Sequence, residues 1–300
     1  MKCAFTTQPE RIIETKYREI NIFNTIGKNI DKKVVGQFGD EWLKFYEYDD
    51  EVIEKVGKEY FNILNNEMVN AETYALDIGC GTGRWTKYLS KRVKFIEAVD
   101  PSDAVFAADK LLGDIANVRL SQASIETLPF ADETFDFVMS VGVLHHIPDT
   151  QKALNDCVQK LKKGGYFYVY LYYNLERRGL FYRTLFRMSD LIRRIVSRLP
   201  GKIKHFVCDI LAFFFYMPFI LAGRLIKFLG FENLAKRVPL HIYQNRSLFM
   251  IRNDALDRFG TRLEQRFSTK QIMEMMENAG LTNIMIGPGF PYYHAVGRRK

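Results

Sequence analysis

Short apolar runs alternate with helical patterns through the middle of the chain. Five runs have the length and the β-branched and aromatic content of strands, and most lack the apolar–polar alternation of a half-exposed strand. The runs are YALDIG, KFIEAVD, VRLSQAS, FDFVMSVG and GGYFYVYLYY. Strands separated by helices in this way predict an α/β fold with a doubly wound parallel sheet over residues 74–173.

The segment before this region carries helix-like periodicity, most clearly in EWLKFYEYDDEVIEKVGKEYFNIL. We therefore expect residues 1–70 to form an N-terminal helical cap. An aromatic face on such a cap suits a cationic ligand, and each ring is equally at home in the core of a helix. The aromatic residues concerned are Phe38, Trp42, Phe45, Tyr46 and Tyr48.

The C-terminal part returns to a regular pattern. The segment STKQIMEMMENAGL has Ser268 as a helix N-cap and Gly280 as a C-cap, and the strand patterns TNIMIG and YYHAVGRR follow it. We expect residues 71–173 and 248–300 to form one core, which leaves 174–247 as an insertion.

This insertion has two long apolar segments. RRGLFYRTLFRMSDLIRRIVSRL has one apolar helical stripe with arginines on the other side, and we expect Arg193, Arg194 and Arg198 to face outward. FVCDILAFFFYMPFILAG, residues 206–223, has one charge and an interior proline, and it is barely long enough to cross a bilayer. Three interpretations stay open: a lid or acceptor-binding cap, a helix in the membrane interface, or a true span.

The positive charge of the chain is concentrated in the same segment. Residues 174–247 contain 14 Lys or Arg and 4 Asp or Glu, a net charge of +10 against +8 for the whole chain. Any attraction to an anionic partner, such as an anionic membrane surface, therefore belongs to this segment. The N-terminus has no secretory signal pattern, and the four cysteines lie far apart, so we expect a cytoplasmic protein with free thiols.

The candidate chemistry begins at YALDIGCGTGR, residues 74–84. Gly79, Gly81 and Gly83 follow a predicted strand and precede a predicted helix, where a ligand can lie against main-chain N–H groups. The G-x-G-x-G spacing differs from the G-x-G-x-x-G of dinucleotide loops, so NAD is not favoured. Asp100 ends the next strand pattern, about 20 residues on, at the usual distance for a ribose-binding carboxylate.

These residues occur within five motifs in a fixed order: LDIGCGTG, VDPS, ASIETLPFADETFDFVMS, VLHHIPD and LKKGGYF. In this order the chain resembles the class I S-adenosylmethionine-dependent methyltransferases, in particular the branch similar to ubiquinone and menaquinone biosynthesis enzymes. The resemblance implies a Rossmann-like, doubly wound, seven-stranded sheet whose last strand is antiparallel, with the basic and hydrophobic helical insertion after the fifth strand. It also implies that the leading segment folds over the cofactor.

The cofactor implied is S-adenosyl-L-methionine. Asp100 should accept hydrogen bonds from the ribose, Pro101 and Ile125 should contact the adenine, and the backbone near Ser124 should bind its polar edge. Relatives usually carry Asp where Ser124 stands, and a hydroxyl accepts more weakly than a carboxylate. The full set of expected cofactor-binding residues is Asp77, Gly79, Cys80, Gly81, Gly83, Asp100, Pro101, Ser124, Ile125 and Val141.

Candidate catalytic and acceptor-binding residues follow the fourth and fifth strand patterns. His145 or His146 could act as a general base or an orienting donor. The expected acceptor walls are Tyr170, Tyr172, Tyr173 and Asn174. Asp254, Asp257 and Arg258 could reach the acceptor, but we favour a structural ion-pair role for them. No metal-ligating constellation is visible in the sequence.

Three functions are consistent with these features. The leading one is methylation of a small, hydrophobic or lipid-like metabolite, indicated by the Phe-rich insertion. The second is methylation of a tRNA wobble uridine, because VLHHIP also resembles that branch and the basic segment could bind phosphate. The third is an inactive, cofactor-binding membrane adaptor. The sequence fixes neither the acceptor atom nor the oligomeric state.

Overall fold

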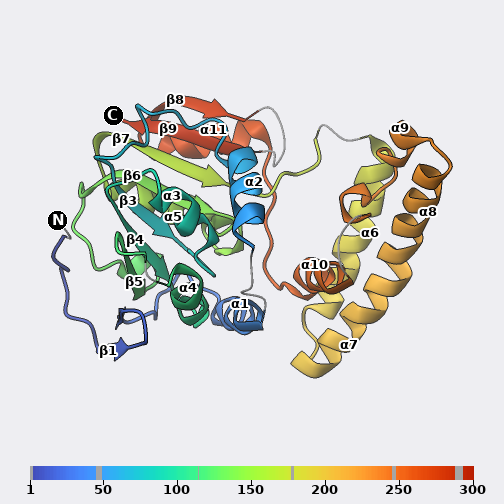
Figure 1. Cartoon of the computed structure of the whole chain (residues 1–300), viewed down its shortest axis with the longest axis horizontal. Helices are drawn as coiled ribbons and strands as arrows, with labels where there is room; N and C mark the ends of the chain where they lie inside the picture. The colour runs from blue at the N-terminus through green and yellow to red at the C-terminus, as the bar shows by residue number, and fades with distance from the viewer. Residues whose placement is uncertain (1–2, 45–48, 114, 177–178, 245–247, 288–292) are drawn as a thin grey trace. The chain divides into compact units, whose positions relative to one another are not determined.

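The chain divides into two compact units in the computed structural model, which describes residues 3–44, 49–113, 115–176, 179–244, 248–287 and 293–300. Unit 1 consists of Met1–Glu176 and Leu263–Lys300, and unit 2 of Arg177–Arg262 (Figure 1). Each unit has a hydrophobic core of its own.

Unit 1 is built on a nine-stranded sheet in the order β1-β2-β5-β4-β3-β6-β7-β9-β8 (Figure 1). The pairs among β2 to β7 are parallel, whereas β9 runs antiparallel to β7 and to β8. The doubly wound parallel sheet and its antiparallel last strand are thus confirmed. The strands are β1 (Arg11–Glu14), β2 (Glu19–Ile22), β3 (Tyr74–Ile78), β4 (Phe95–Asp100), β5 (Val118–Gln122), β6 (Phe135–Val141), β7 (Leu161–Tyr170), β8 (Leu281–Ile286) and β9 (His294–Arg299).

The expectation of seven strands was wrong, because β1 and β2 extend the sheet from within the segment predicted to be helical. β2 pairs in parallel with β5, with Ile20 opposite Leu120, and both side chains are fully buried. β1 then folds back antiparallel on β2. The hairpin covers what would otherwise be an open sheet edge. Each strand has only four residues, too short to stand out against the helical periodicity of the rest of the segment.

Helices cover both faces of the sheet. Alternate residues of one strand belong to different cores: Ala75 lies in the cluster shared with α2, α3 and α4, and Leu76 in the cluster shared with α5 and α11. Ser268 caps α11 as predicted, because its side chain accepts a hydrogen bond from the Gln271 N–H. The helices of unit 1 are α1 (Lys32–Lys44), α2 (Asp50–Tyr60), α3 (Arg84–Ser90), α4 (Ala104–Leu112), α5 (Thr150–Gln159) and α11 (Thr269–Asn278), with short 3-10 turns η1 (Ile125–Thr127) and η2 (Leu144–His146).

Unit 2 is entirely helical in its described residues. A π-helical turn, η3 (Ala212–Tyr216), joins α7 to α8 in one continuous helix, Gly201–Phe228. Pro218 follows this turn, and a proline has no N–H for the regular helical bond, which accounts for the local change of pitch. The helices are α6 (Leu180–Val196), α7 (Gly201–Leu211), α8 (Met217–Phe228), α9 (Glu232–Ala235) and α10 (Leu248–Gly260), with a 3-10 turn η4 (His241–Tyr243).

The helix α10 belongs to unit 2, although the sequence suggested that residues from 248 onward belong to the core. It packs on α6 and α7. Ile251, Ala255 and Phe259 are buried in the same cluster as Val196 and Cys208. The apolar face of α10 therefore completes the core of unit 2, which runs to Arg262 rather than ending at 247.

Candidate active site

The glycine loop connects β3 directly to α3. Gly79, Gly81 and Gly83 have φ angles of 77°, 54° and 79°, which side chains disfavour. The Gly79 N–H donates to the Val99 carbonyl at 2.8 Å and holds the loop against β4. A Cβ atom on Gly79 would lie 2.4 Å from Val143 Cγ2, so a side chain has no room there. The strand, tight turn and helix predicted from this stretch are confirmed.

Asp100 ends β4, and its carboxylate lies beside the glycine loop. One oxygen accepts the Gly81 N–H at 2.9 Å, and the other accepts the N–H and the hydroxyl of Ser102 at 2.9 and 2.6 Å. Burial raises the pKa of Asp100, and these hydrogen bonds oppose that rise. The oxygen that accepts the Gly81 N–H can accept one further bond, so a ribose hydroxyl remains a suitable partner. Ser102 was not among the predicted site residues, although it belongs to the VDPS motif.

Asp77 and Cys80 are buried beneath the loop. The Asp77 carboxylate accepts a hydrogen bond from the Thr86 hydroxyl at 2.6 Å and so ties β3 to α3. Burial raises the pKa of Asp77 to about 7, the Thr86 bond lowers it, and the neighbouring Asp100 charge raises it. Burial also raises the pKa of the Cys80 thiol well above its usual value. Both groups therefore support the loop from below, and the Cys80 thiol stays protonated at neutral pH.

The residues expected around the adenine follow β4 and β5. Pro101 and Ile125 are partly buried. Ser124 is only 3% exposed, and its hydroxyl lies 2.8 Å from the Thr127 hydroxyl in a capping box at the start of η1. The Ser124 hydroxyl thus has a partner within the protein, and because a hydroxyl has two acceptor lone pairs, its suggested role at the adenine stays a prediction. Val141, at the end of β6, is buried.

The helix α1 brings two of the expected cap aromatics to this edge of the sheet. The ring of Phe38 lies 4.8 Å from that of His146. A Cβ on Gly81 would lie 3.7 Å from the indole nitrogen of Trp42, and the Arg84 guanidinium lies 5.7 Å from the Trp42 ring. One face of α1 therefore reaches both the glycine loop and the histidines. The other residues of that expectation, Phe45, Tyr46 and Tyr48, lie outside the described residues.

The two histidines differ in their surroundings. His145 is fully buried, and neither ring nitrogen has a hydrogen-bond partner; its ring stacks on Tyr172 at 3.8 Å. Burial, followed by the neighbouring His146 and Arg266, lowers the pKa of His145 well below its usual value, so this ring stays neutral. His146 Nδ1 lies 2.7 Å from the Leu263 carbonyl oxygen. A carbonyl only accepts, so Nδ1 carries the hydrogen and Nε2 is the basic nitrogen of the neutral ring.

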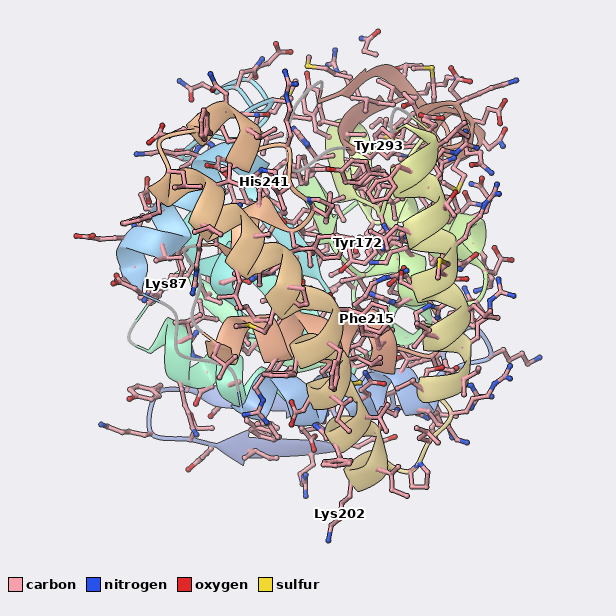
Figure 2. All side chains as sticks on the ribbon, turned by 90° about the vertical axis from the view of Figure 1, so that its right-hand side faces the viewer. Lys87, Tyr172, Lys202, Phe215, His241 and Tyr293 are labelled. Atoms are coloured by element: carbon pink, nitrogen blue, oxygen red, sulfur yellow. The ribbon has the colours of Figure 1, made fainter. Side chains whose placement is uncertain are left out.

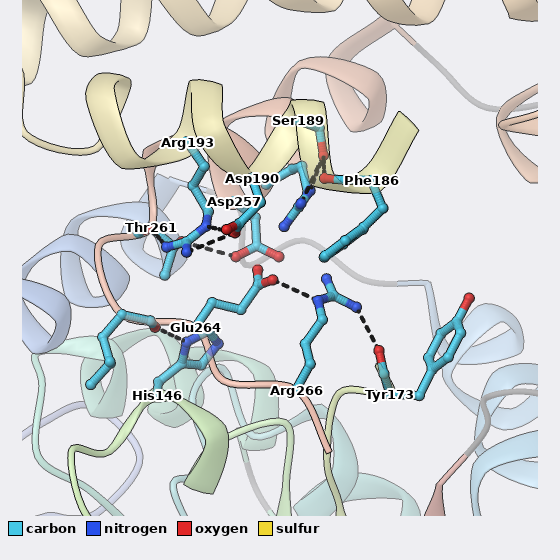
Figure 3. A network of polar contacts seen from close by, with 12 residues as sticks. His146, Tyr173, Phe186, Ser189, Asp190, Arg193, Asp257, Thr261, Glu264 and Arg266 are labelled. Carbon is cyan, nitrogen blue, oxygen red and sulfur yellow. Dashed lines mark hydrogen bonds and ion pairs between the residues drawn. The ribbon is translucent and has the colours of Figure 1, made fainter. Parts of the chain in front are cut away.

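The segment 263–267, which the sequence did not single out, holds the histidine motif in place. Besides the Leu263 contact, the Gln265 N–H donates to the His145 carbonyl at 2.9 Å. Arg266 forms a 2.8 Å ion pair with Glu264 and donates to the Tyr173 carbonyl, as Figure 3 shows. Apart from the Glu264–Arg266 pair, these contacts join residues more than 90 positions apart, and no local pattern marks them.

The four predicted acceptor residues do not lie together, and the alternation of an extended chain separates Tyr173 from Tyr170 and Tyr172. The rings of Tyr170 and Tyr172 lie 6.0 Å apart, and Tyr172 contacts both histidines. Tyr173 points elsewhere and packs edge-on against Tyr293 at 5.6 Å. Asn174 is exposed, and its side chain accepts a backbone N–H two residues on. Only Tyr170 and Tyr172 therefore lie with the histidines.

The residues Asp254, Asp257 and Arg258 have structural partners within unit 2. Asp254 accepts hydrogen bonds from the hydroxyls of Tyr216, at 2.7 Å, and Tyr243. Asp257 accepts from Thr261 at 3.2 Å, and Arg258 donates to Ser189 at 2.7 Å. These contacts agree with the structural role that we favoured.

The glycine loop and Asp100 fit S-adenosylmethionine. The Gly81 position leaves open the approach of a ligand to the main chain, because a Cβ there would meet only Trp42 and at no less than 3.7 Å. The Asp100 carboxylate is fixed beside the same backbone. Trp42 is an aromatic ring of the kind that attracts a cationic sulfonium.

Comparisons with known proteins agree with this arrangement. Residues 76–169 match the family described as methyltransferase domain. The uncharacterized methyltransferase Mb0092 of Mycobacterium bovis is 30% identical over 148 residues, which cover 49% of this chain and 73% of that protein. The uncharacterized methyltransferase YcgJ of Bacillus subtilis is 30% identical over 151 residues, covering 48% of this chain and 58% of that protein.

Two further similarities are more limited. The demethylmenaquinone methyltransferase of Staphylococcus aureus is 35% identical over 107 residues, covering 34% of this chain and 44% of that protein. The crystal structure of YcgJ superposes with a TM-score of 0.45 at 17% identity, covering 79% of this chain and 70% of that one. The assignment therefore rests on the sequence matches and the glycine-loop site: the chain belongs to the class I S-adenosylmethionine-dependent methyltransferases.

Proposed function

We propose that this methyltransferase transfers the methyl group of S-adenosylmethionine to a small, hydrophobic, quinone-like or lipid-like acceptor. The observation that carries the proposal is an aromatic wall at the histidine motif, made of Phe38, His145, His146, Tyr170 and Tyr172. His145 has no hydrogen-bonding partner and stays neutral, so this wall favours an apolar ring over a charged group. The partial match to a demethylmenaquinone methyltransferase supports the same class.

His146 is the proposed proton acceptor. The cofactor supplies an electrophilic methyl carbon on a sulfonium sulfur. Held by the glycine loop and Asp100, the cofactor would give up this methyl carbon to the acceptor and would keep the electron pair of the broken bond on sulfur. An acceptor that starts as a hydroxyl or a C–H must also lose a proton, and the basic Nε2 of His146 can take it. The Leu263 carbonyl fixes the tautomer that leaves this nitrogen basic.

Alignment and exclusion of water supply the rest of the catalysis. Positive charge disappears from the cofactor during transfer, so the reaction needs a dry, well-positioned site more than a strong opposing charge. Tyr172, held between His145 and the Arg266 guanidinium, positions one wall. The helix α1, through Phe38 and Trp42, lines the same edge.

Transfer of label to an extract tests this proposal. The protein is incubated with S-adenosylmethionine labelled in its methyl group and a total extract of the producing organism, and the labelled products are separated by solvent partition and identified by mass spectrometry. We expect the label in one small molecule that partitions into organic solvent. Label found only in RNA would show the proposal wrong and would favour the tRNA alternative. Loss of labelling in Asp100→Ala confirms that the protein itself is the catalyst.

A further inference from the structure

Unit 2 exposes far more apolar surface than unit 1. Among the described residues, 18 of the 25 exposed large hydrophobic side chains belong to unit 2, which has 86 of the 300 residues. Isolated exposed apolar residues need no explanation, but a contiguous set of this size marks an interaction surface.

The long helix Gly201–Phe228 carries most of this surface, and its two sides differ. One side is buried against the rest of unit 2 at intervals of about four residues, by Cys208, Ala212, Tyr216 and Ile220. The opposite side, which we call the outer face, is apolar and exposed between 39% and 87%. Phe215 lies midway along the helix and Lys202 near one end (Figure 2). The outer face consists of Ile203, Phe206, Ile210, Phe213, Phe214, Leu221, Leu225 and Phe228.

Exposed positive charges lie at both ends of this helix, and Arg224, exposed within it, donates to the Gln244 carbonyl. Unit 2 contains 17 Lys or Arg and 5 Asp or Glu, so it carries +12 while unit 1 carries −4. Arg198 and Lys202 are exposed at the start of the helix. Lys227, at its end, and Lys236 beyond it are exposed as well. An apolar strip with cations at its rim matches the layering of anionic headgroups over hydrocarbon.

The helix α6 adds a second strip of the same kind. Leu180, Met188, Leu191 and Ile195 are between 58% and 79% exposed on it. Arg187 is exposed on the same helix. The stripe predicted from the sequence is therefore amphipathic as expected, but much of its apolar side is solvent-facing.

Arg193 does not contribute to this surface, contrary to the expectation that it faces outward. Its guanidinium is buried, forms a 2.8 Å ion pair with Asp190, and donates to the carbonyls of Thr261 and Arg262 at 3.0 Å (Figure 3). The sequence could not distinguish it from Arg194, which is 67% exposed in its side chain. Arg193 therefore holds α6 to the end of unit 2.

We propose that the outer face of Gly201–Phe228 binds an anionic lipid surface, with the helix lying parallel to the membrane. The helix is about 42 Å long, and by length and composition alone it could cross a bilayer. A span would, however, place the half-exposed Asp209–Arg252 ion pair and the partly buried Asp254 carboxylate at the depth of the hydrocarbon. Lying flat, the helix buries only its outer face and leaves these groups on the aqueous side. The inference does not depend on the identity of the acceptor.

Vesicle flotation of the full-length protein tests this surface. We expect at least tenfold more binding to phosphatidylcholine vesicles containing phosphatidylglycerol than to pure phosphatidylcholine at low salt, and release at high salt. The double variant Phe213→Ser, Phe214→Ser should lose at least tenfold in binding. The matched control Ile26→Ser changes an apolar residue of unit 1 that is 64% exposed, and it should bind as the unchanged protein does.

Charge variants separate the rim from the apolar strip. Replacing Arg198, Lys202 and Lys227 with Gln should remove the preference for anionic vesicles and its salt dependence. The same change at Lys55 and Lys163, two exposed lysines of unit 1, should have no effect. Circular dichroism and S-adenosylmethionine binding confirm for every variant that the protein is folded.

Three outcomes would overturn the proposal. Equal binding to neutral vesicles that resists salt and alkaline carbonate would show a true span. A dimer in sedimentation experiments that Phe213→Ser, Phe214→Ser dissociates, without vesicle binding, would show that a second copy covers the outer face. A monomer that binds neither vesicle would show that the surface has no lipid partner. Cofactor binding persists in each case, so these failures are distinct from a failure of the methyl-transfer proposal.

Discussion

The two units contain the same kinds of apolar residues, but unit 1 buries its largest ones and unit 2 leaves many of them exposed. In unit 1, helices on both faces bury the sheet, and its largest side chains, such as Phe137 and Tyr168, are fully buried. In unit 2, the helix Gly201–Phe228 buries one side and leaves the other apolar and exposed. Burial on both faces is what a catalytic scaffold requires, because it fixes the loops at the strand ends. A helix apolar on both sides instead has surface left over for a partner.

Polar groups follow the same division. In unit 1 they converge at the carboxyl ends of the strands, where Asp100, the glycine loop and the histidines lie. In unit 2, the buried Arg193 and the partly buried Asp254 form hydrogen bonds with partners of their own unit. The candidate catalytic groups therefore lie in unit 1, and unit 2 carries the exposed apolar face proposed to bind lipid. Substitutions that separate chemistry, packing and surface test this division.

The largest effect is expected from replacing His146 in unit 1, with His241 in unit 2 as the matched control. His146→Gln should lower kcat about 10²- to 10⁴-fold on an acceptor that loses a proton, because the base is removed. Affinity for S-adenosylmethionine should stay within about twofold, since the glycine loop is untouched. His241→Gln, an exposed position of unit 2, should leave both quantities unchanged. Steady-state kinetics with the identified acceptor measure this, and an unchanged kcat in His146→Gln would remove the proposed base.

Neighbouring residues on the long helix sharpen the contrast between its sides. Ile220 is fully buried and Leu221 is 53% exposed. Ile220→Ala should lower the free energy of unfolding by about 2–5 kcal/mol, through lost burial and a cavity. Leu221→Ala should change it by no more than about 0.5 kcal/mol. Urea unfolding followed by circular dichroism compares the two variants. Equal losses would mean that the outer face is covered within the protein.

Replacing Asp100 should weaken the binding of S-adenosylmethionine, whereas replacing its near neighbour Asp103 should not. Asp100→Ala removes the carboxylate that accepts from the glycine loop and is proposed to accept from the ribose. We expect S-adenosylmethionine affinity to fall by about 1.5–3 kcal/mol, about tenfold to 150-fold. Asp103→Ala changes an exposed carboxylate, and affinity should be unaltered. Titration calorimetry decides between these results, and an unweakened Asp100→Ala would overturn the assignment of its role.

The sequence predicted unit 1 better than unit 2 for physical reasons. The glycine loop, the parallel strands and the Ser268 cap depend on local residue types and periodicities, which are visible in any single stretch. The β1–β2 hairpin was missed because its strands are only four residues long. The burial of Arg193 on α6 was missed. A helical period predicts which residues share a face of the helix, but not which other element packs against that face. Arg193 and Arg194 are adjacent in the sequence, and only the packing of α10 decides which is buried.

Long-range contacts limited the prediction of the site in the same way. The histidine motif was recognised, but its tautomer depends on the Leu263 carbonyl, 117 residues away. Tyr170, Tyr172 and Tyr173 were grouped by position in the sequence, whereas the extended chain turns Tyr173 to the opposite side. The capping contact between the hydroxyls of Ser124 and Thr127 was not predicted either, because it depends on the turn that follows β5.

The smallest expected effect compares one buried carboxyl group in each unit. Burial raises the pKa of Asp254 to about 6, and the hydroxyls of Tyr243 and Tyr216 oppose this rise; Asp77 is raised to about 7. In the unfolded chain both titrate near 3.8. The folded protein therefore holds a proton that the unfolded chain releases, so each group stabilises most below about pH 4 and loses that contribution as the pH rises through its folded value.

Asp254→Asn should remove this pH dependence from unit 2. Relative to the variant, the unchanged protein should lose on the order of 1 kcal/mol of unfolding free energy between pH 4.5 and 7.5. The difference should level off above about pH 6, where Asp254 is ionised, whereas for Asp77→Asn it should continue to about pH 7. Urea unfolding at closely spaced pH values measures both curves. A difference that grows in the opposite direction would mean that the two tyrosine hydroxyls stabilise the ionised Asp254 more than burial destabilises it.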